Sequence, residues 1–416
     1  MLQVFSSSWA LLLGMMLLMV GNGLQGTLLG VRGGLEGFST FEMSVVMSAY
    51  FAGFLGGSRL APEMIRRVGH VRVFAALASF ISAILILYPA FAHPVAWAVG
   101  RAAIGFCFSG VYVTAESWLN NSADNTNRGK ALSVYMIVQM FGIVSAQVLL
   151  TLGDASGYAL FIVSSVLVSI SFAPILLSIS PTPAFETAKP MHLKTLMVTS
   201  PLGCFGMFLL GGVFSAQFGM SAVYGVAAGL TIAQISIFVS SIYVGALLMQ
   251  YPIGWFSDRV DRRLVILLVA AMGGAMSVVA FLFDHYFGVL LVAAFVIGGT
   301  SNPLYSLLIA YTNDYLEADD MAAAAGGLIF INGMGAISGP LVTGWMMDTF
   351  GTQAFFMVIA ILMLSLTGYA GYRMTQRTRD GIEDGAYAPV LPSASLVSVE
   401  VASEYYIETA LEEESN

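Results

Sequence analysis

The sequence predicts an all-α integral membrane protein with twelve transmembrane helices in two six-helix bundles. Its composition, its long uncharged stretches and the placement of its basic residues all support this prediction. Of the 416 residues, 58% are hydrophobic and only 10% are charged, and the mean hydropathy is +0.84. Soluble domains carry about 25% charged residues. The composition therefore indicates a chain whose main solvent is a lipid bilayer, which excludes an ordinary soluble enzyme or binding domain.

Long stretches without Asp, Glu, Lys or Arg supply the predicted spans, since one crossing needs about 20 apolar residues. The uncharged stretches are residues 195–257, 264–283, 285–313, 321–347 and 349–372. The first six predicted spans are 9–31, 43–61, 72–90, 95–118, 131–152 and 157–178. The second six are 201–223, 230–256, 264–283, 286–311, 322–346 and 352–372. These runs are too long and too continuously apolar for the alternating strands of an outer-membrane barrel.

The basic residues predict the orientation, because Lys and Arg near a span stay on the cytoplasmic side. With twelve spans, every Lys and Arg except Arg32 and Arg101 falls on one side. We therefore expect a multi-pass protein of the bacterial inner membrane with both termini in the cytoplasm. Because Arg32 is the first charged residue, a basic signal-peptide start is absent, and the first apolar run is expected to remain as a helix.

The predicted spans divide into two related halves. Arg67-Val68 after the second span matches Arg259-Val260 after the eighth, an offset of 192, and one residue further on Gly142 matches Gly335. We predict an N-terminal bundle at 1–179, a cytoplasmic linker at 180–200, a C-terminal bundle at 201–373 and a disordered, acidic cytoplasmic tail at 374–416. A regulatory or partner-binding tail is the alternative. Repeated halves are typical of secondary transporters, whose substrate site lies at the membrane midplane.

Several motifs resemble those of the major facilitator superfamily. Gly254, Asp258 and the basic residues that follow resemble its signature loop, whereas the first-half copy has Arg66 where the acid would stand. Arg101 with Gly105 resembles its intramembrane arginine motif. Further stretches resemble the loop ending of the superfamily (128–129) and its YcaD-like branch (21–27, 115–120 and 303–306). The resemblance covers about residues 9–375. It implies two pseudo-symmetric bundles with a cavity lined by the first, fourth, seventh and tenth spans.

An exporter-like Gly-x-x-x-Gly-Pro element stands at residues 335–340. It lies in the eleventh span, whereas proton-driven exporters carry it in the fifth. The direction of transport therefore stays open.

Polar residues within the spans are the predicted substrate-binding set, because polar and ionisable groups in a bilayer are costly and mark functional sites. The set is Asn22, Gln25, Arg101, Tyr112, Gln217, Asn302, Tyr305 and Ser306. Arg101 is the strongest candidate, with snorkelling to the outer interface as its alternative. The neutral residues have a second interpretation, since polar side chains also hold membrane helices together. That structural interpretation is favoured for Gln139, Gln147, Gln250 and Asn332.

A second set is predicted to gate the cytoplasmic side. It comprises Arg66, Arg67, Glu116, Arg128, Asp258 and Arg259. Glu116 lies about 22 Å along the fourth span from Arg101, so the two cannot pair. We expect Glu116 to meet Arg66, Arg67 or Arg128 as a latch, with proton transfer and a passive carboxylate as alternatives. Asp258 with Arg259 would form the matching latch in the second half.

The predicted function is transport of a small organic solute by alternating access, driven by its own gradient or by protons. Alternatives are a transporter-like receptor or scaffold without net flux, and a lipid translocase. No enzyme is expected, because the chain lacks a phosphate-binding loop, a nucleophile elbow and a zinc-protease motif. The expected partners are a small-molecule substrate, protons and the lipid bilayer, without nucleic acid, cofactor or metal, in a monomer. The sequence does not specify the substrate, the coupling ion or the role of the tail.

Overall fold

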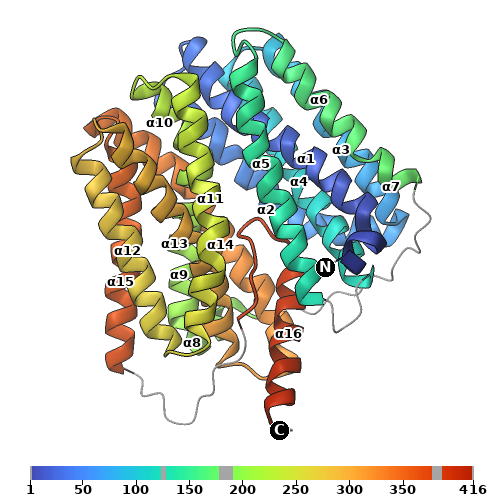
Figure 1. The fold of residues 1–416 in the computed structure, drawn as a ribbon, viewed down its shortest axis with the longest axis vertical. Coiled ribbons are helices and arrows are strands. Elements are labelled where there is room, and N and C mark those ends of the chain that lie inside the picture. Colours follow the sequence, from blue (N-terminus) through green and yellow to red (C-terminus); the bar gives the residue numbers. More distant parts are fainter. Residues whose placement is uncertain (1, 123–127, 178–190, 377–386, 415–416) are drawn as a thin grey trace.

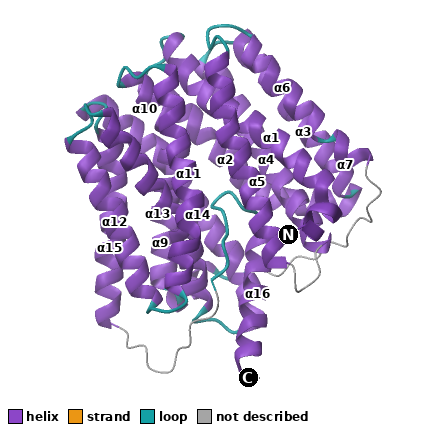
Figure 2. Cartoon of the chain, viewed as in Figure 1, coloured by secondary structure: helices purple, strands orange, loops and turns teal. Residues whose placement is uncertain are grey.

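The computed structural model describes residues 2–122, 128–177, 191–376 and 387–414 (Figure 1). Within these ranges the chain forms helices and loops, and no strand (Figure 2). The first half contains α1 (Leu2–Leu35), α2 (Thr40–Val68), α3 (His70–Ala90), α4 (Pro94–Ser122), α5 (Arg128–Leu152), α6 (Ala159–Ser171) and the short α7 (Ala173–Leu177). The predicted linker falls partly outside the described residues, at 178–190.

The second half begins with the short α8 (Leu193–Thr199). Its spans are α9 (Pro201–Ser215) continued by the π-helical η2 (Ala216–Met220) and α10 (Ser221–Ala227), then α11 (Ile232–Ser257), α12 (Arg262–Leu282), α13 (Phe287–Asn313), α14 (Ala318–Phe350) and α15 (Ala354–Gln376). A last helix, α16 (Leu396–Glu414), lies between the two halves.

Each of the twelve predicted spans corresponds to a helix or a broken helix. Ten helices in the described ranges are long and apolar enough to cross a membrane. The other two crossings are α2, which carries charged residues near both ends, and α6 with α7, where the helix is interrupted at Phe172. The expected all-helical fold in two bundles is thus confirmed.

Matching helix starts reveal the repeat in local structure. Ser39 caps α2 in a capping box with Glu42, and Thr231 caps α11 in a capping box with Gln234. In each box the hydroxyl accepts the third backbone N–H of the helix while the longer side chain accepts the cap N–H. The two boxes are separated by the offset found in the sequence, so both halves begin their second crossing in the same way.

Glycines give the two halves the same close helix packing. In the first half, Gly53 on α2 faces the carbonyl of Ala102 on α4. Gly245 on α11 faces the carbonyl of Phe295 on α13 in the second half. A Cβ atom at either glycine would overlap the facing carbonyl oxygen. Small residues at such crossings allow helix backbones to approach closely in the membrane.

We expect Gly245→Leu to prevent the correct packing of α11 on α13. Overpacking costs about 1–3 kcal/mol even where neighbours can adjust, and the neighbour here is backbone. The expected result is a large loss of monodisperse protein and a lower unfolding temperature in detergent. Gly288→Leu is the matched control, because a Cβ at Gly288 meets nothing within 4 Å. If the two variants give equal yields of monodisperse protein and equal unfolding temperatures, this packing of α11 on α13 is contradicted.

The two ends of the molecule differ. We call the end that carries Arg66, Arg67, Arg259, Arg262 and Arg263 the basic end, and the other the far end. At the far end the halves are in direct contact. Phe41 N on α2 donates to Asp348 Oδ2 on α14 at 3.1 Å, and Ser48 Oγ donates to the carbonyl oxygen of Ile337 at 2.5 Å. The far end is therefore closed to passage between the halves in this state.

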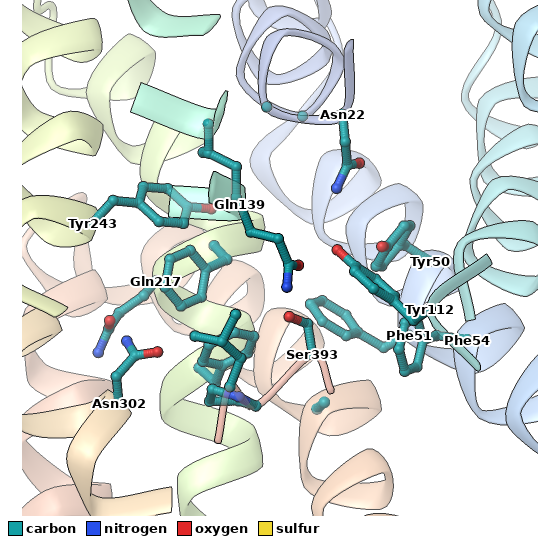
Figure 3. Close-up of a pocket in the computed structure, with 18 of the residues that line it drawn as sticks. Asn22, Tyr50, Phe51, Phe54, Tyr112, Gln139, Gln217, Tyr243, Asn302 and Ser393 are labelled. Carbon is teal, nitrogen blue, oxygen red and sulfur yellow. The ribbon is translucent and has the colours of Figure 1, made fainter. Parts of the chain in front are cut away.

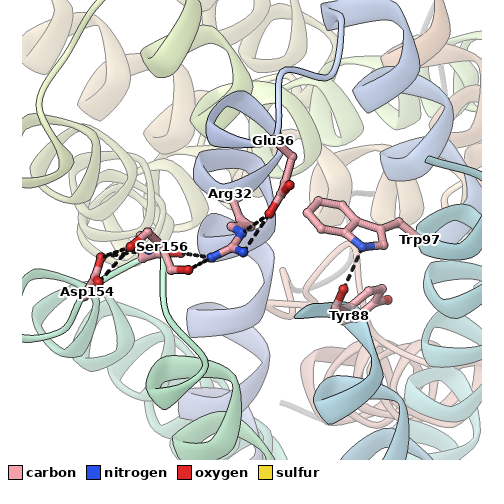
Figure 4. A network of polar contacts seen from close by, with 7 residues as sticks. Arg32, Glu36, Tyr88, Trp97, Asp154 and Ser156 are labelled. Atoms are coloured by element: carbon pink, nitrogen blue, oxygen red, sulfur yellow. Dashed lines mark hydrogen bonds and ion pairs between the residues drawn. The ribbon is translucent and has the colours of Figure 1, made fainter. Parts of the chain in front are cut away.

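Polar contacts also fasten the first half internally at the far end (Figure 4). Arg32 on α1 donates to Glu36 Oε1 at 2.7 Å and to the carbonyl oxygen of Ala155 at 3.3 Å, in the loop between α5 and α6. Trp97 Nε1 on α4 donates to the carbonyl oxygen of Tyr88 on α3 at 3.0 Å. Arg32 thus has a structural role, which explains a basic residue outside the predicted cytoplasmic loops.

The prediction of a disordered tail is wrong for residues 387–406. Residues 387–395 enter the gap between the halves without helical structure, and α16 continues along the basic end. Most side chains from Val390 to Ala402 are buried. The physical reason is local composition, since residues 385–399 carry no charge although acids flank them. The first part of the predicted tail, residues 377–386, lies outside the described residues.

Candidate functional site: a central cavity

A cavity of about 1340 Å³ lies between the two halves, above the docked tail. Its wall combines amide and hydroxyl groups with aromatic rings. In Figure 3, Asn22, Tyr50 and Tyr112 lie on one side of the cavity, Gln217, Tyr243 and Asn302 lie on the other, and Ser393 of the tail lies between them.

Five of the eight predicted substrate-binding residues line this cavity. They are Asn22, Arg101, Tyr112, Gln217 and Asn302. The structure does not place the other three in the wall. Gln25 lies behind it and accepts a hydrogen bond from Arg101, Tyr305 is buried in the core, and Ser306 contacts the tail. The predicted polar stripe on α13 therefore faces two environments, because Asn302 faces the cavity while Ser306 and Asn313 bind the tail.

Arg101 is 4% exposed and does not reach the outer interface. Its Nη1 donates to Gln25 Oε1 at 3.1 Å, its Nη2 lies 3.4 Å from Met47 Sδ, and its guanidinium carbon lies 4.6 Å from the centre of the Tyr50 ring. Its Nε has no hydrogen-bond partner within the described chain. A buried cation is costly unless it is paired or faces a polar cavity. Gln25, Met47 and Tyr50 are neutral, so Arg101 can attract a negative or strongly accepting group in the cavity.

Gln217 and Asn302 present a donor and an acceptor that the described residues leave unused. Gln217 Oε1 accepts from Ser301 Oγ at 3.1 Å, which leaves its Nε2 without a partner. Asn302 Nδ2 donates to the carbonyl of Gly298 at 3.4 Å, which leaves its Oδ1 without one. Gln217 lies in the π-helical turn η2, and such turns are frequent at functional sites. Buried unpaired amide atoms beside a cavity are suited to a polar ligand.

Aromatic side chains form a wall on each side. Phe218 on η2 lies 4.7 Å from Tyr243 between ring centres, and Phe54 on α2 lies 6.0 Å from Tyr112. Rings at such separations form flat apolar surfaces. The cavity can therefore hold a solute by ring contact as well as by hydrogen bonds.

Sequence reasoning missed several residues of the wall. Gln139, Gln147 and Asn332 were expected to be structural, and all three also line the cavity. Gln147 donates to the carbonyl oxygen of Gly23 on α1, and Asn332 donates to that of Met207 on α9, so these two amides join helices as well. Tyr50 and Tyr243 were not selected. The repeat contained the signal for this pair, because the two tyrosines are separated by the same offset as Gly142 and Gly335.

The predicted gating residues are arranged differently from expectation. Arg66 and Arg67 are exposed and pair with Glu63 on their own helix, at 2.8 and 2.6 Å. Glu116 is 2% exposed and accepts from both the backbone N and the Oγ of Ser395, at 2.8 and 2.6 Å. The predicted latch between Glu116 and Arg66 or Arg67 is therefore wrong. The reason is that the tail occupies the space beside Glu116.

The second predicted latch also binds the tail. Asp258 Oδ1 accepts from Tyr387 N at 2.9 Å. Arg259 donates to the carbonyl oxygen of Trp255 at 2.9 Å, and its guanidinium carbon lies 4.2 Å from the centre of the Trp255 ring. The side chain of Arg128 lies outside the described residues. The carboxylates of both predicted latches thus meet residues 387–395, which sequence reasoning did not anticipate.

Family comparisons agree with this architecture, half by half. The profile described as "Major Facilitator Superfamily" matches residues 203–392, and that of "Sugar (and other) transporter" matches residues 6–200. Both halves of the chain are therefore similar to transporters of the major facilitator superfamily. The uncharacterized MFS-type transporters YcaD of Escherichia coli O45:K1 (strain S88) and of strain ED1a are each 27% identical to it over 372 residues, 87% of this chain and 95% of theirs. The resemblance to YcaD-like proteins is thus confirmed.

Solved structures share the fold. A mutant of the nucleoside transporter NupG matches with a TM-score of 0.77 at 14% identity, over 88% of this chain and all of that one. The fucose:proton symporter FucP of E. coli matches with a TM-score of 0.56 at 16% identity, over 89% of this chain and 98% of that one. Together with the apolar helices, the family matches support a multi-pass membrane protein that transports a solute.

Proposed function

We propose that this transporter moves a small polar solute, neutral or singly anionic, through the central cavity by alternating access. The observation that carries the proposal is the chemistry of the wall. It contains amides, hydroxyls, aromatic rings and Arg101, and none of its described residues is Asp, Glu, Lys or His. The cavity lies between the two repeated halves, where transporters of this design place their substrate site.

The charge of the wall selects against cations. Arg101 supplies a positive charge at the cavity, and no described carboxylate of the wall offsets it. A cationic solute would therefore enter a repulsive, low-dielectric site. A carboxylate or phosphate would gain a charge-assisted hydrogen bond from Arg101, and a neutral solute would use the amides of Gln217 and Asn302.

The proposed orientation places the basic end in the cytoplasm of a bacterial cell, since basic residues near spans stay on that side. The far end then faces outward and is closed in this state, so the structure corresponds to an inward-facing arrangement with its entrance occupied by the tail.

Proton coupling is part of the proposal. Glu116 is the buried carboxylate nearest in sequence to the cavity residue Tyr112, and it adjoins the Tyr135 hydroxyl at 3.5 Å.

A matched ligand screen tests the proposal. Unfolding temperature would be measured with neutral, anionic and cationic solutes of similar size, including nucleosides and fucose because the solved relatives are named for them. A ligand at 100 times its dissociation constant should stabilise by about 2.7 kcal/mol. We expect stabilisation by neutral or anionic compounds, followed by uptake of the same compound into proteoliposomes with and without a proton gradient.

Stabilisation by cations alone would contradict the proposed specificity. Binding without uptake under any gradient would favour the receptor alternative, and movement of lipid headgroups without solute uptake would favour the translocase.

A further inference from the structure

We infer that residues 387–406 are an internal ligand that closes the cavity from the basic end and wedges the two halves apart there. This segment is called the plug below. The inference adds regulation to the proposed transport function. It rests on contacts that the plug makes with both halves, on its burial and on its reach into the cavity.

The plug binds the second half through its backbone and one tyrosine. Tyr387 N donates to Asp258 at 2.9 Å, and the Tyr387 hydroxyl accepts from Gln250 Nε2 at 2.7 Å. Ser306 Oγ accepts from Val390 N at 2.9 Å and lies 3.1 Å from the Val390 carbonyl oxygen. A single hydroxyl thus meets both backbone groups of Val390. Such pairing is what a non-helical chain needs when it is buried away from water.

Helix α16 extends the same attachment along the basic end. Asn313 Nδ2 donates to Ser403 Oγ at 3.1 Å, and the Tyr406 hydroxyl donates to Asp314 Oδ1 at 2.8 Å. Asp314 is held by Arg262 at 2.5 Å in an ion pair whose side chains are 1% and 3% exposed. The plug therefore ends on a rigid, buried part of the second half.

The first half holds the plug through Glu116 on α4. Ser395 donates both its N–H and its hydroxyl to Glu116 Oε2. Ser398 and Val401 face Leu119 on α4 and Leu132 on α5 across a small pocket. Contacts to both halves mean that the basic end cannot close while the plug is in place, because the plug fills the space between them.

The leading part of the plug reaches the substrate cavity itself. Leu391, Pro392 and Ser393 form part of its wall, and Ser393 lies between the aromatic side chains in Figure 3. Pro389 and Pro392 suit this position, since proline has no backbone N–H that would need a partner in the cavity. The plug thus occupies the route by which a solute would leave or enter at the basic end.

The first test measures access to the cavity and does not depend on the solute. Asn22→Cys in a background with Cys107→Ala and Cys204→Ala gives one thiol in the cavity wall, and its reaction rate with a water-soluble maleimide is measured in detergent. Adding Val399→Asp, at a position that is 0% exposed, should release the plug and speed labelling at least about tenfold, since a carboxylate buried without a partner costs several kcal/mol. Glu317→Gln, at an exposed position outside the plug, should leave the rate unchanged.

Equal labelling rates with and without Val399→Asp would overturn the inference that the plug blocks access to the cavity. Monodisperse elution of each variant is the check that the helix bundle remains folded.

A reversible lock gives a second, independent test within one protein. Asn313→Cys and Ser403→Cys, in the same cysteine-free background, place two thiols where the native side chains are in contact. Oxidation should hold the plug in place and stop uptake of the solute found in the ligand screen, and reduction should restore it. Uptake that survives complete cross-linking would overturn the inference. The labelling test stands even if no uptake is found, so failure of the plug and failure of the transport proposal are distinguishable.

The plug should also respond to pH through Glu400 on α16. Burial and, to a smaller extent, the neighbouring Glu404 raise the pKa of Glu400 to about 7. The other charged groups at this helix are Glu116 from α4, and Asp314 with Arg262 from the second half. The docked state binds more protons than the released state, so this contribution to docking is fully present below the ordinary glutamate pKa of 4.5 and is lost as pH rises through 7.

The pH arm compares labelling of Asn22→Cys with and without Glu400→Gln. The ratio of the two rates cancels the pH dependence of maleimide chemistry. We expect the rate with the native Glu400, divided by the rate with Glu400→Gln, to be several-fold larger at pH 8 than at pH 5. A ratio that is the same at both values would contradict the buried position of Glu400 and, with it, the docked plug.

Discussion

Arg101→Met is expected to stabilise the protein against heat while removing solute binding. The guanidinium is buried, it contacts the neutral side chains of Gln25 and Tyr50, and its Nε is unpaired within the described chain. Replacing a buried charge by an apolar side chain of similar length removes a desolvation cost. The free energy of unfolding should therefore rise by on the order of 1 kcal/mol, which is measured as a higher unfolding temperature. The affinity for the transported solute should fall about 10–100-fold, as expected when a hydrogen bond to a charged group of about 1.5–3 kcal/mol is lost.

Arg101→Lys is the matched control for charge. Lysine keeps the cation but loses the flat surface that stacks on Tyr50 and the fork of donors that reaches Gln25. If binding depends on charge alone, Lys restores it. If it depends on the geometry of Arg101, Lys behaves like Met. If the Arg101→Met variant is less stable and binds the solute unchanged, Arg101 is not part of the binding site.

Arg262→Met is expected to destabilise the protein by about 3–5 kcal/mol, because it removes the cationic partner of a buried carboxylate. Arg262 lies 2.5 Å from Asp314, and both side chains are almost completely buried. The pair joins the start of α12 to the end of α13, where the plug also attaches through Tyr406. Unfolding temperature in detergent is the measurement. The double variant Arg262→Met with Asp314→Leu should recover much of the loss, since no unpaired charge remains.

Arg67→Met is the control for this prediction. Arg67 pairs with Glu63, but its side chain is 73% exposed, and exposed pairs contribute about 1 kcal/mol or less. If Arg262→Met and Arg67→Met have equal effects, the buried pair does not hold the basic end.

The twelve crossings could be predicted because a bilayer imposes a simple rule on sequence. Uncharged runs of sufficient length and one-sided basic loops identify spans without knowledge of tertiary contacts. The repeat was equally visible, and the structure shows why. Each half has a glycine at the same close helix crossing, Gly53 and Gly245. Each half also has the same capping box at the start of its second crossing, at Ser39 and Thr231.

The cavity could be predicted only in part, because which face of a span meets the cavity depends on how the halves pack. Asn22, Gln217 and Asn302 were predicted correctly to lie there. The same reasoning assigned Gln139 to helix packing, since an amide in a span looks alike in either role. The function of these residues in substrate binding stays a prediction.

The tail was the largest error, and its cause is specific. The acids at the end of the chain dominated the composition and indicated a solvated segment, while the uncharged residues 385–399 lay among them. Only the tertiary fold shows the cleft that buries those residues and the Glu116 carboxylate that Ser395 reaches. A segment without charge inside an acidic tail is the signal that would have predicted docking.

Distances across the two ends of the molecule test the central claim of alternating access most directly. Spin labels at His93 and His285 report on the far end, and labels at Val68 and Glu317 report on the basic end, all exposed positions from opposite halves. In the Val399→Asp background, a solute that binds in the screen should shift the two distance distributions in opposite directions, longer at the far end and shorter at the basic end. Distributions at both ends that do not change when that solute saturates the protein would contradict transport by alternating access.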